Sequence, residues 1–182
     1  MYSRDQAVGL PHARGGEDLA RALPRNRESA SMVASGSTRT SFRKDFKVDD
    51  LKRFVDNDRL ANHLGIEVLE HAKGRARARM TIQAHHLNSA GTLHGGAIFT
   101  LADAAFAAAS NSHGTLAMAI NASISYFKAI SGGTVIATAE EISFNPKLAT
   151  YLVHVNDDAG TPVALFQGTV YRKKETLGEM LA

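Results

Sequence analysis

The order of apolar and polar positions predicts a helix followed by a strand hairpin in the first patterned part of the chain. Apolar side chains spaced as on one face of a helix run from Leu51 to about Leu60, and Gly65 ends the pattern. The helix can be capped by either of two aspartates that precede it, Asp49 and Asp50. Strict alternation then predicts two strands with one solvent-exposed face, residues 66–70 and 76–82, joined by a turn.

One long helix is predicted from Gly95 to about Asn111, between a polar loop at 83–92 and Gly114. Alanine dominates this helix, so neighbouring elements can approach it closely. Its polar side chains are expected on one narrow stripe, which faces either solvent or a cleft: Thr100, Asp103, Ser110 and Asn111. In a cleft, Asp103 would be the ionisable group of the stripe.

Four further strands separated by turn residues complete the pattern, at residues 116–127, 134–143, 150–155 and 163–171. Strands that follow and precede one long helix, joined by tight turns, are typical of an antiparallel sheet packed on that helix. The expected fold class is therefore α+β.

The first 45 residues differ from the rest in composition and charge. They hold eight Lys and Arg against five Asp and Glu, a balance of +3, which equals the net charge of the whole chain. Because they lack a sustained helical or strand period, we expect a disordered basic leader (1–45) before one domain (46–182). Met32 stays open as an alternative start. The neutral domain gives no reason to expect a nucleic-acid partner.

Composition and missing motifs exclude several other functions. The chain has no cysteine, which removes disulfides and thiolate chemistry and favours a cytoplasmic location. No apolar stretch is long enough to suggest a membrane span. Three histidines (His85, His86, His94) lack acidic residues at ligand spacing, so no metal is expected. Neither a serine nucleophile elbow nor a glycine-rich phosphate loop is present.

The segment from Asn88 to Asp103, NSAGTLHGGAIFTLAD, resembles the hotdog-fold acyl-CoA thioesterases of the phenylacetate-pathway (PaaI) type. The spacing Asn-x5-His-Gly-Gly-x6-Asp carries the resemblance, which extends over roughly residues 60–172. It implies a hotdog fold, in which an antiparallel sheet wraps around one long central helix. It also implies hydrolysis of a CoA thioester without a metal or cofactor.

The resemblance further implies roles for individual residues of the motif. The Gly95 N–H would polarise the thioester carbonyl, and Asp103 would act as nucleophile or general base. Asn88 would orient water or substrate, and His94 would support the loop. Unpaired N–H groups at a helix start suit a developing oxyanion, because they lie at the positive end of the helix dipole. Gly96, without a side chain, would let the substrate approach the backbone.

Substrate contacts are less strongly specified. Phe99 and Phe106 are expected to line a tunnel for an aryl-acetyl or medium-chain acyl group. Lys128 and Lys147 are candidates for contacts with CoA phosphates, with ordinary solvated surface as the alternative. For Asn88 the alternative is a purely loop-shaping role. An acyl-CoA sensor without turnover and a hotdog hydratase are alternative functions.

Helix geometry adds a prediction about assembly once Gly95 and Asp103 have these roles. The two residues are eight positions apart, which corresponds to about 12 Å along a helix axis. A carboxylate must come within ~3–3.5 Å of the carbon it attacks. Asp103 is therefore expected to serve the Gly95 of a second chain related by a two-fold axis. We expect a homodimer, with a dimer of dimers as the larger assembly.

Overall fold

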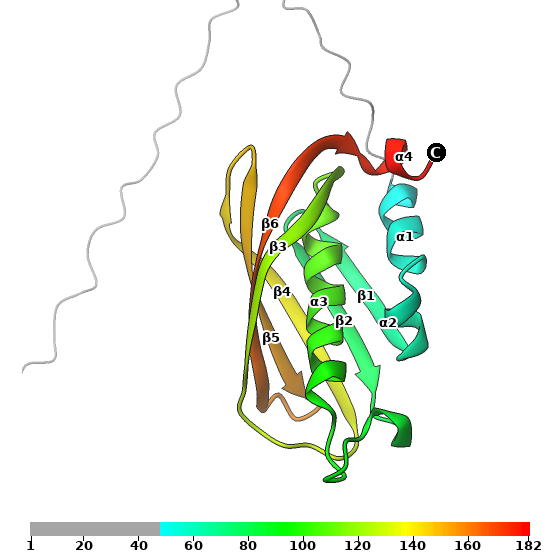
Figure 1. Ribbon diagram of the computed structural model, residues 1–182, viewed down its shortest axis with the longest axis vertical. Coiled ribbons are helices and arrows are strands. Elements are labelled where there is room, and N and C mark those ends of the chain that lie inside the picture. The colour runs from blue at the N-terminus through cyan, green and yellow to red at the C-terminus, as the bar shows by residue number, and fades with distance from the viewer. Residues whose placement is uncertain (1–47) are drawn as a thin grey trace, which may run out of the picture. The chain divides into compact units, whose positions relative to one another are not determined.

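A computed structural model describes residues 48–182, so the leader predicted at 1–45 lies outside the described residues. Figure 1 shows one long helix, α3, lying across a face of the sheet, with α1 and α2 beside it. The elements in chain order are α1 (Val48–Asp56), α2 (Arg59–His63), β1 (Ile66–Ala72), β2 (Arg75–Thr81), a 3-10 turn (Ala84–His86), α3 (Gly95–Asn111), β3 (Thr115–Tyr126), β4 (Thr134–Phe144), β5 (Leu148–Asp157), β6 (Pro162–Thr176) and α4 (Leu177–Met180).

The six strands form one antiparallel sheet in the order β1-β2-β4-β5-β6-β3. Helix α3 contacts every strand of this sheet. The helix comes from the middle of the chain, between β2 and β3, and β3 joins the far edge beside β6. The predicted α+β class, with an antiparallel sheet around one long helix, is confirmed.

Small side chains on both partners allow α3 to lie close to the sheet. Strand β2 alternates between buried alanines facing the helix and exposed arginines on the other face, as the period-two pattern predicts. Phe106 fills the space over β5 and β6, with its ring centroid 5.5 Å from those of Tyr151 and Phe166. A Cβ on Gly168 would lie 2.7 Å from the Phe106 ring, so glycine is required there. Phe106 is therefore a buried core residue, and the acyl tunnel expected beside it stays a prediction.

The predicted first helix is two helices. Helix α1 ends at Asp56, and Asp58 caps α2 by accepting hydrogen bonds from the Leu60 and Ala61 N–H groups at 3.1 and 3.0 Å. The apolar spacing is continuous through this break, whereas an aspartate favours a cap over a helix interior. The chain turns before β1 at Gly65, which has a φ of 61°.

The predicted polar stripe of α3 is only half right. Thr100 and Asp103 are partly exposed, but Ser110 and Asn111 are each 1% exposed. Asn111 closes the end of α3 instead, because its amide accepts from the Ala117 N–H at 2.9 Å and donates to the Ala107 carbonyl at 3.0 Å. The partly exposed row of the helix consists of Gly96, Thr100, Asp103 and Ala107.

Candidate active site

The first turn of α3 leaves one backbone donor available. His94 is the N-cap residue, and its Nδ1 accepts a hydrogen bond from the Gly96 N–H at 2.8 Å. The next two N–H groups, of Ala97 and Ile98, both bond to the His94 carbonyl. Among the described residues, the Gly95 N–H has no acceptor. The predicted loop-supporting role of His94 thus has a geometric basis, and the free donor at this helix start is Gly95.

Neighbouring side chains leave little room for a Cβ at either glycine of the motif. A Cβ on Gly95 would lie 3.2 Å from the Tyr126 ring and hydroxyl, and a Cβ on Gly96 would lie 3.0 Å from His94 Nδ1. Tyr126 comes from the end of β3, and its hydroxyl donates to the Gly95 carbonyl at 2.9 Å. Burial raises the pKa of this phenol, so it stays a donor at neutral pH. The sequence contains Tyr126 within the similar stretch, but nothing in the local pattern indicates its contact with Gly95.

Asn88 organises the loop that leads to α3. Its Oδ1 accepts from the Ala90 and Thr92 N–H groups at 2.9 and 3.2 Å, and its Nδ2 donates to Thr92 Oγ1 at 3.0 Å. These bonds support the loop-shaping alternative. An amide nitrogen carries two hydrogens, and Thr92 takes one of them. The second hydrogen stays available for a water or a substrate atom.

Asp103 lies in the middle of α3, away from the Gly95 end of its own chain. It is half-buried, and burial, with a smaller contribution from the nearby Asp58 carboxylate, raises its pKa above the ordinary aspartate value. A raised pKa in a partly buried carboxylate is typical of catalytic acids and bases. Asp58 was not predicted to be near Asp103, because it falls within what the apolar spacing suggests is one helix.

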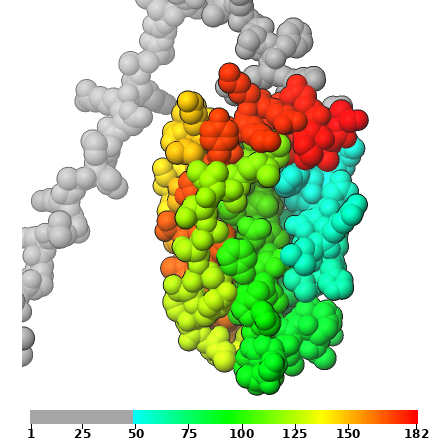
Figure 2. Space-filling model, in the orientation of Figure 1, coloured from blue at the N-terminus to red at the C-terminus, as the bar shows by residue number. Residues whose placement is uncertain are grey.

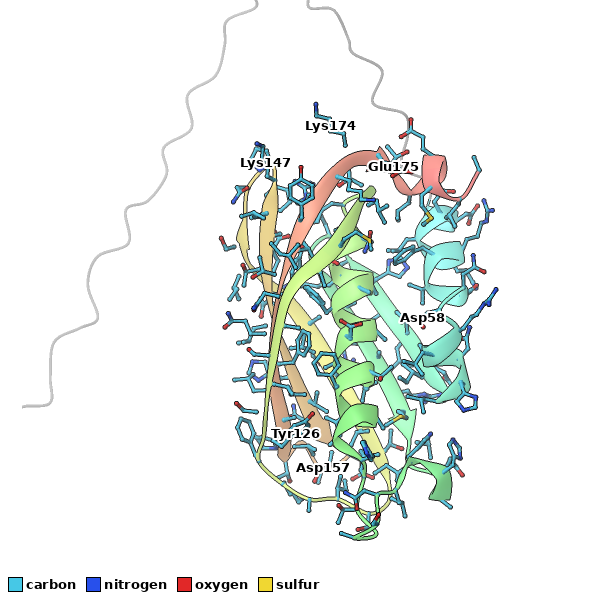
Figure 3. All side chains as sticks on the ribbon, viewed as in Figure 1. Asp58, Tyr126, Lys147, Asp157, Lys174 and Glu175 are labelled. Carbon is cyan, nitrogen blue, oxygen red and sulfur yellow. The ribbon has the colours of Figure 1, made fainter. Side chains whose placement is uncertain are left out.

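The remaining predicted site residues are Phe99 of α3, Lys128 after β3, and Lys147, which Figure 3 shows at the β4–β5 turn. Phe99 packs edge-on against Phe166 with ring centroids 5.3 Å apart, and is only partly buried. Lys128 donates to Asp157 at 2.7 Å and thereby ties the segment after β3 to the end of β5. Lys147, in the β4–β5 turn, lies at the end of the molecule opposite to Tyr126. One chain therefore does not bring the two lysines together.

Within residues 48–182, no three side chains of the metal-binding types gather into a group that could hold an ion. No helix in the same part of the chain has the length and apolar character needed to cross a membrane.

Comparison with known proteins places this geometry in a family. Residues 90–164 match the thioesterase superfamily. A protein of Archaeoglobus fulgidus is 45% identical over 135 residues, which cover 73% of this chain and 88% of that protein. The acyl-coenzyme A thioesterase PaaI of Escherichia coli is 36% identical over 118 residues, covering 64% of this chain and 84% of that protein. The chain belongs to the thioesterase superfamily.

Solved structures of other superfamily members share the fold. The E. coli PaaI protein from the phenylacetic acid degradation operon aligns with a TM-score of 0.68 and 33% identity, over 70% of this chain and 94% of that one. A variant of the phenylacetic acid degradation protein PaaI from Thermus thermophilus aligns with a TM-score of 0.61 and 42% identity, over 64% of this chain and 100% of that one. The predicted hotdog fold, the resemblance to PaaI-type proteins and the thioester hydrolase class are confirmed.

Proposed function

We propose that this thioesterase hydrolyses acyl-CoA thioesters that carry an aryl-acetyl or medium-chain acyl group. The observation that carries the proposal is that α3 holds both a free backbone donor, the Gly95 N–H, and a partly buried carboxylate, Asp103, whose pKa is raised by burial. The relative named acyl-coenzyme A thioesterase PaaI supplies the substrate class.

The reaction begins with polarisation of the thioester carbonyl. The carbonyl oxygen accepts a hydrogen bond from the Gly95 N–H, at the positive end of the α3 dipole. The Asp103 carboxylate attacks the carbonyl carbon directly or takes a proton from a water that attacks it. Negative charge develops on the carbonyl oxygen and is stabilised by the same N–H. The C–S bond then breaks, and the sulfur leaves as CoA thiolate, which takes up a proton. Where water attacks, the acyl group leaves as the carboxylic acid and the proton held by Asp103 passes to the thiolate. Where Asp103 attacks, the acyl group stays on it as a mixed anhydride, and a water hydrolyses this anhydride to the free acid and the Asp103 carboxylate.

Two chains are needed to assemble this site. Gly95 and Asp103 lie on the same helix, about 12 Å apart along its axis. A carboxylate side chain cannot cover that distance and still reach a carbonyl held at the Gly95 N–H. In the proposed dimer, each Asp103 acts on a carbonyl bound by the Gly95 of the partner subunit, and two equivalent sites result.

Strand β3 is the surface that supports such a dimer. It is an edge strand of 12 residues, Thr115–Tyr126, without a charged residue or proline. Exposed apolar side chains lie along it and just beyond its end, with Met118, Ile120 and Phe127 at 49, 60 and 58% exposure. Free edges of this length and composition are normally protected. Antiparallel pairing of β3 with the same strand of a second copy gives hydrogen-bond partners to the free N–H and C=O groups of this edge. It also makes the two α3 helices run in opposite directions.

Asn88 and the lysines have secondary roles in this proposal. The remaining N–H of the Asn88 amide holds a water or the substrate beside Gly95. Lys147 is a candidate for a CoA phosphate contact with the partner subunit, since antiparallel pairing brings opposite ends of the two chains together. Lys128 is engaged with Asp157, so we assign it a structural role first.

A panel of acyl-CoAs with a thiol reagent tests the function. Because the chain has no cysteine, the reagent reports only released CoA. We expect phenylacetyl-CoA or octanoyl-CoA to release CoA, and Asp103→Asn to lower the rate by about 10² or more, the usual scale for a positioned base. Tight binding without release would support the sensor instead, and hydration without release would support the hydratase. A folded Asp103→Asn variant with wild-type turnover would remove Asp103 from the mechanism.

A further inference from the structure

A pocket of about 640 Å³ lies between α3 and the wall formed by α1, α2, β1 and the C-terminal residues. Its apolar lining includes Phe54 and Val55 of α1, Val68 of β1, and Ala104 and Ala107 of α3. The volume falls within the ~300–1,000 Å³ usual for small-molecule sites. Figure 2 shows α1 and α2 alongside α3 on this face of the fold.

The pocket is next to Asp103. Ala104 follows Asp103 directly, and Ala107 is one helical turn further along the same side of α3. On the opposite wall, Asp58 lines the pocket and its carboxylate acts electrostatically on Asp103. A carbonyl carbon held at Asp103 would therefore lie beside this pocket.

The charge of the pocket determines which end of the substrate it accepts. Three acidic residues line it, Asp56, Asp58 and Glu67, whereas its described lining contains no basic residue. Two of these carboxylates have cationic partners outside the pocket, since Asp56 pairs with Lys52 and Glu67 with Arg79. The phosphates of CoA would be repelled by this lining, but an uncharged apolar acyl group would not.

We propose that the acyl group occupies this pocket, in the same chain that supplies Asp103, while the CoA moiety extends toward the subunit that supplies Gly95. The inference rests on the proposed function and adds an acyl site that differs from the tunnel expected at Phe99 and Phe106. The small residues of α3 then have a second use. Alanine at 104 and 107 keeps the pocket open beside the carboxylate, as well as allowing close packing elsewhere on the helix.

Filling the pocket from either wall tests the proposal. In Ala107→Leu and Val68→Phe, the new side chain occupies acyl space from α3 and from β1. We expect each variant to lower the ratio of kcat/KM for octanoyl-CoA to that for acetyl-CoA by about tenfold or more, the range associated with a few carbon atoms in an apolar site. Phenylacetyl-CoA, measured in the same way, distinguishes an aromatic from an extended acyl group.

Leu69→Phe is the matched control for the variant on β1. Leu69 follows Val68, lies at a bulge in the β1–β2 pairing, is 44% exposed and does not line the pocket. For Leu69→Phe, the ratio of kcat/KM for octanoyl-CoA to that for acetyl-CoA should stay at the wild-type value. If Ala107→Leu and Val68→Phe both fold and keep the wild-type ratio, the acyl site is elsewhere and the pocket has another occupant. If wild type releases no CoA from any acyl-CoA, the proposed function itself is wrong.

Discussion

At the scale of single residues, the proposed chemistry depends on a backbone N–H, which cannot be removed by ordinary side-chain substitution. Gly95 is the first residue of α3, and its N–H bonds to no described group. Proline is favoured at this helix position because its missing N–H is not needed there. His94, with φ −62° and ψ 132°, already has the extended conformation that a residue before proline requires.

Gly95→Pro is therefore expected to remove the oxyanion donor with little effect on the helix. We expect kcat to fall by about 10²–10³, the scale for the loss of one such donor. Gly95→Ala is the matched control, because it places a Cβ against Tyr126 at the same 3.2 Å but keeps the N–H. Equal kcat values for the two variants would show that the Tyr126 contact matters rather than the donor.

The raised pKa of Asp103 predicts a pH dependence. The reactive form is the carboxylate, so kcat/KM should rise with pH through a pKa above that of an ordinary aspartate. Burial is the main cause of the shift and Asp58 the second. Asp58→Asn keeps the α2 cap, because asparagine caps equally well. The substitution should move the acidic limb of kcat/KM to lower pH. The apparent pKa of this limb should still lie above that of an ordinary aspartate, because burial remains.

The measurement is kcat/KM from pH about 4 to 8 for wild type, Asp58→Asn and Asp56→Asn. Asp56 lines the same pocket but does not contribute to the shift, so its variant should keep the wild-type limb. A limb that stays in place in Asp58→Asn would contradict the electrostatic link between Asp58 and Asp103.

At the scale of elements, the ion pair between Lys128 and Asp157 joins the segment after β3 to the end of β5. Asp157 is 6% exposed, and its pKa is lowered chiefly by the hydrogen bond from Lys128, then by the Thr161 N–H. A lowered carboxyl pKa stabilises the fold above the ordinary value of 3.8, and this contribution is lost as pH falls through the folded-state pKa.

Lys128→Met should therefore lower the free energy of unfolding at neutral pH, with the difference from wild type shrinking in acid. Urea unfolding at pH about 7 and about 3 measures this. Lys147→Met is the control, since no ion pair joins Lys147 to the described residues, and its stability should match wild type. An unchanged neutral-pH stability in Lys128→Met would leave Lys128 free for the phosphate role.

Most of the helices and strands can be predicted from the sequence. Alternation and turn residues located all six strands, and α3 has its predicted limits, Gly95–Asn111. The break between α1 and α2 was missed because apolar spacing continues across it. Residues 110 and 111 were misplaced because periodicity identifies polar positions on a helix, whereas the loop to β3 decides whether such a position is capped and buried.

The motif likewise predicted only part of the candidate site. His94 at the N-cap and the free N–H of Gly95 follow from a local helix start, so the sequence alone indicates them. The contacts of Tyr126 with Gly95 and of Asp58 with Asp103 join distant segments, and no spacing rule reveals them. The pocket beside Asp103 depends on how α1 and α2 pack against α3, which no local pattern in the sequence indicates.

At the scale of the whole molecule, the uncharged β3 edge predicts how the chain assembles. A lysine at Ile120, which is 60% exposed, would bring two like charges close together across a β3–β3 interface. Ile120→Lys should therefore shift the dimer toward monomer in light scattering and lower turnover in proportion. Leu60→Lys on α2 is the control, because Leu60 is 57% exposed but lies away from β3. Dimeric Ile120→Lys with full activity would exclude this interface.

The most direct test of the cross-subunit site mixes Asp103→Asn with Gly95→Pro under conditions of demonstrated subunit exchange. Each mixed dimer then has one site with an intact Asp103 and an intact Gly95 from its two chains. Because random exchange makes half of the dimers mixed, about a quarter of wild-type activity should appear. Mixing wild type with the double variant should likewise leave about a quarter. No recovered activity in the first mixture, together with about half in the second, would show that both residues act within one chain and would contradict the cross-subunit site.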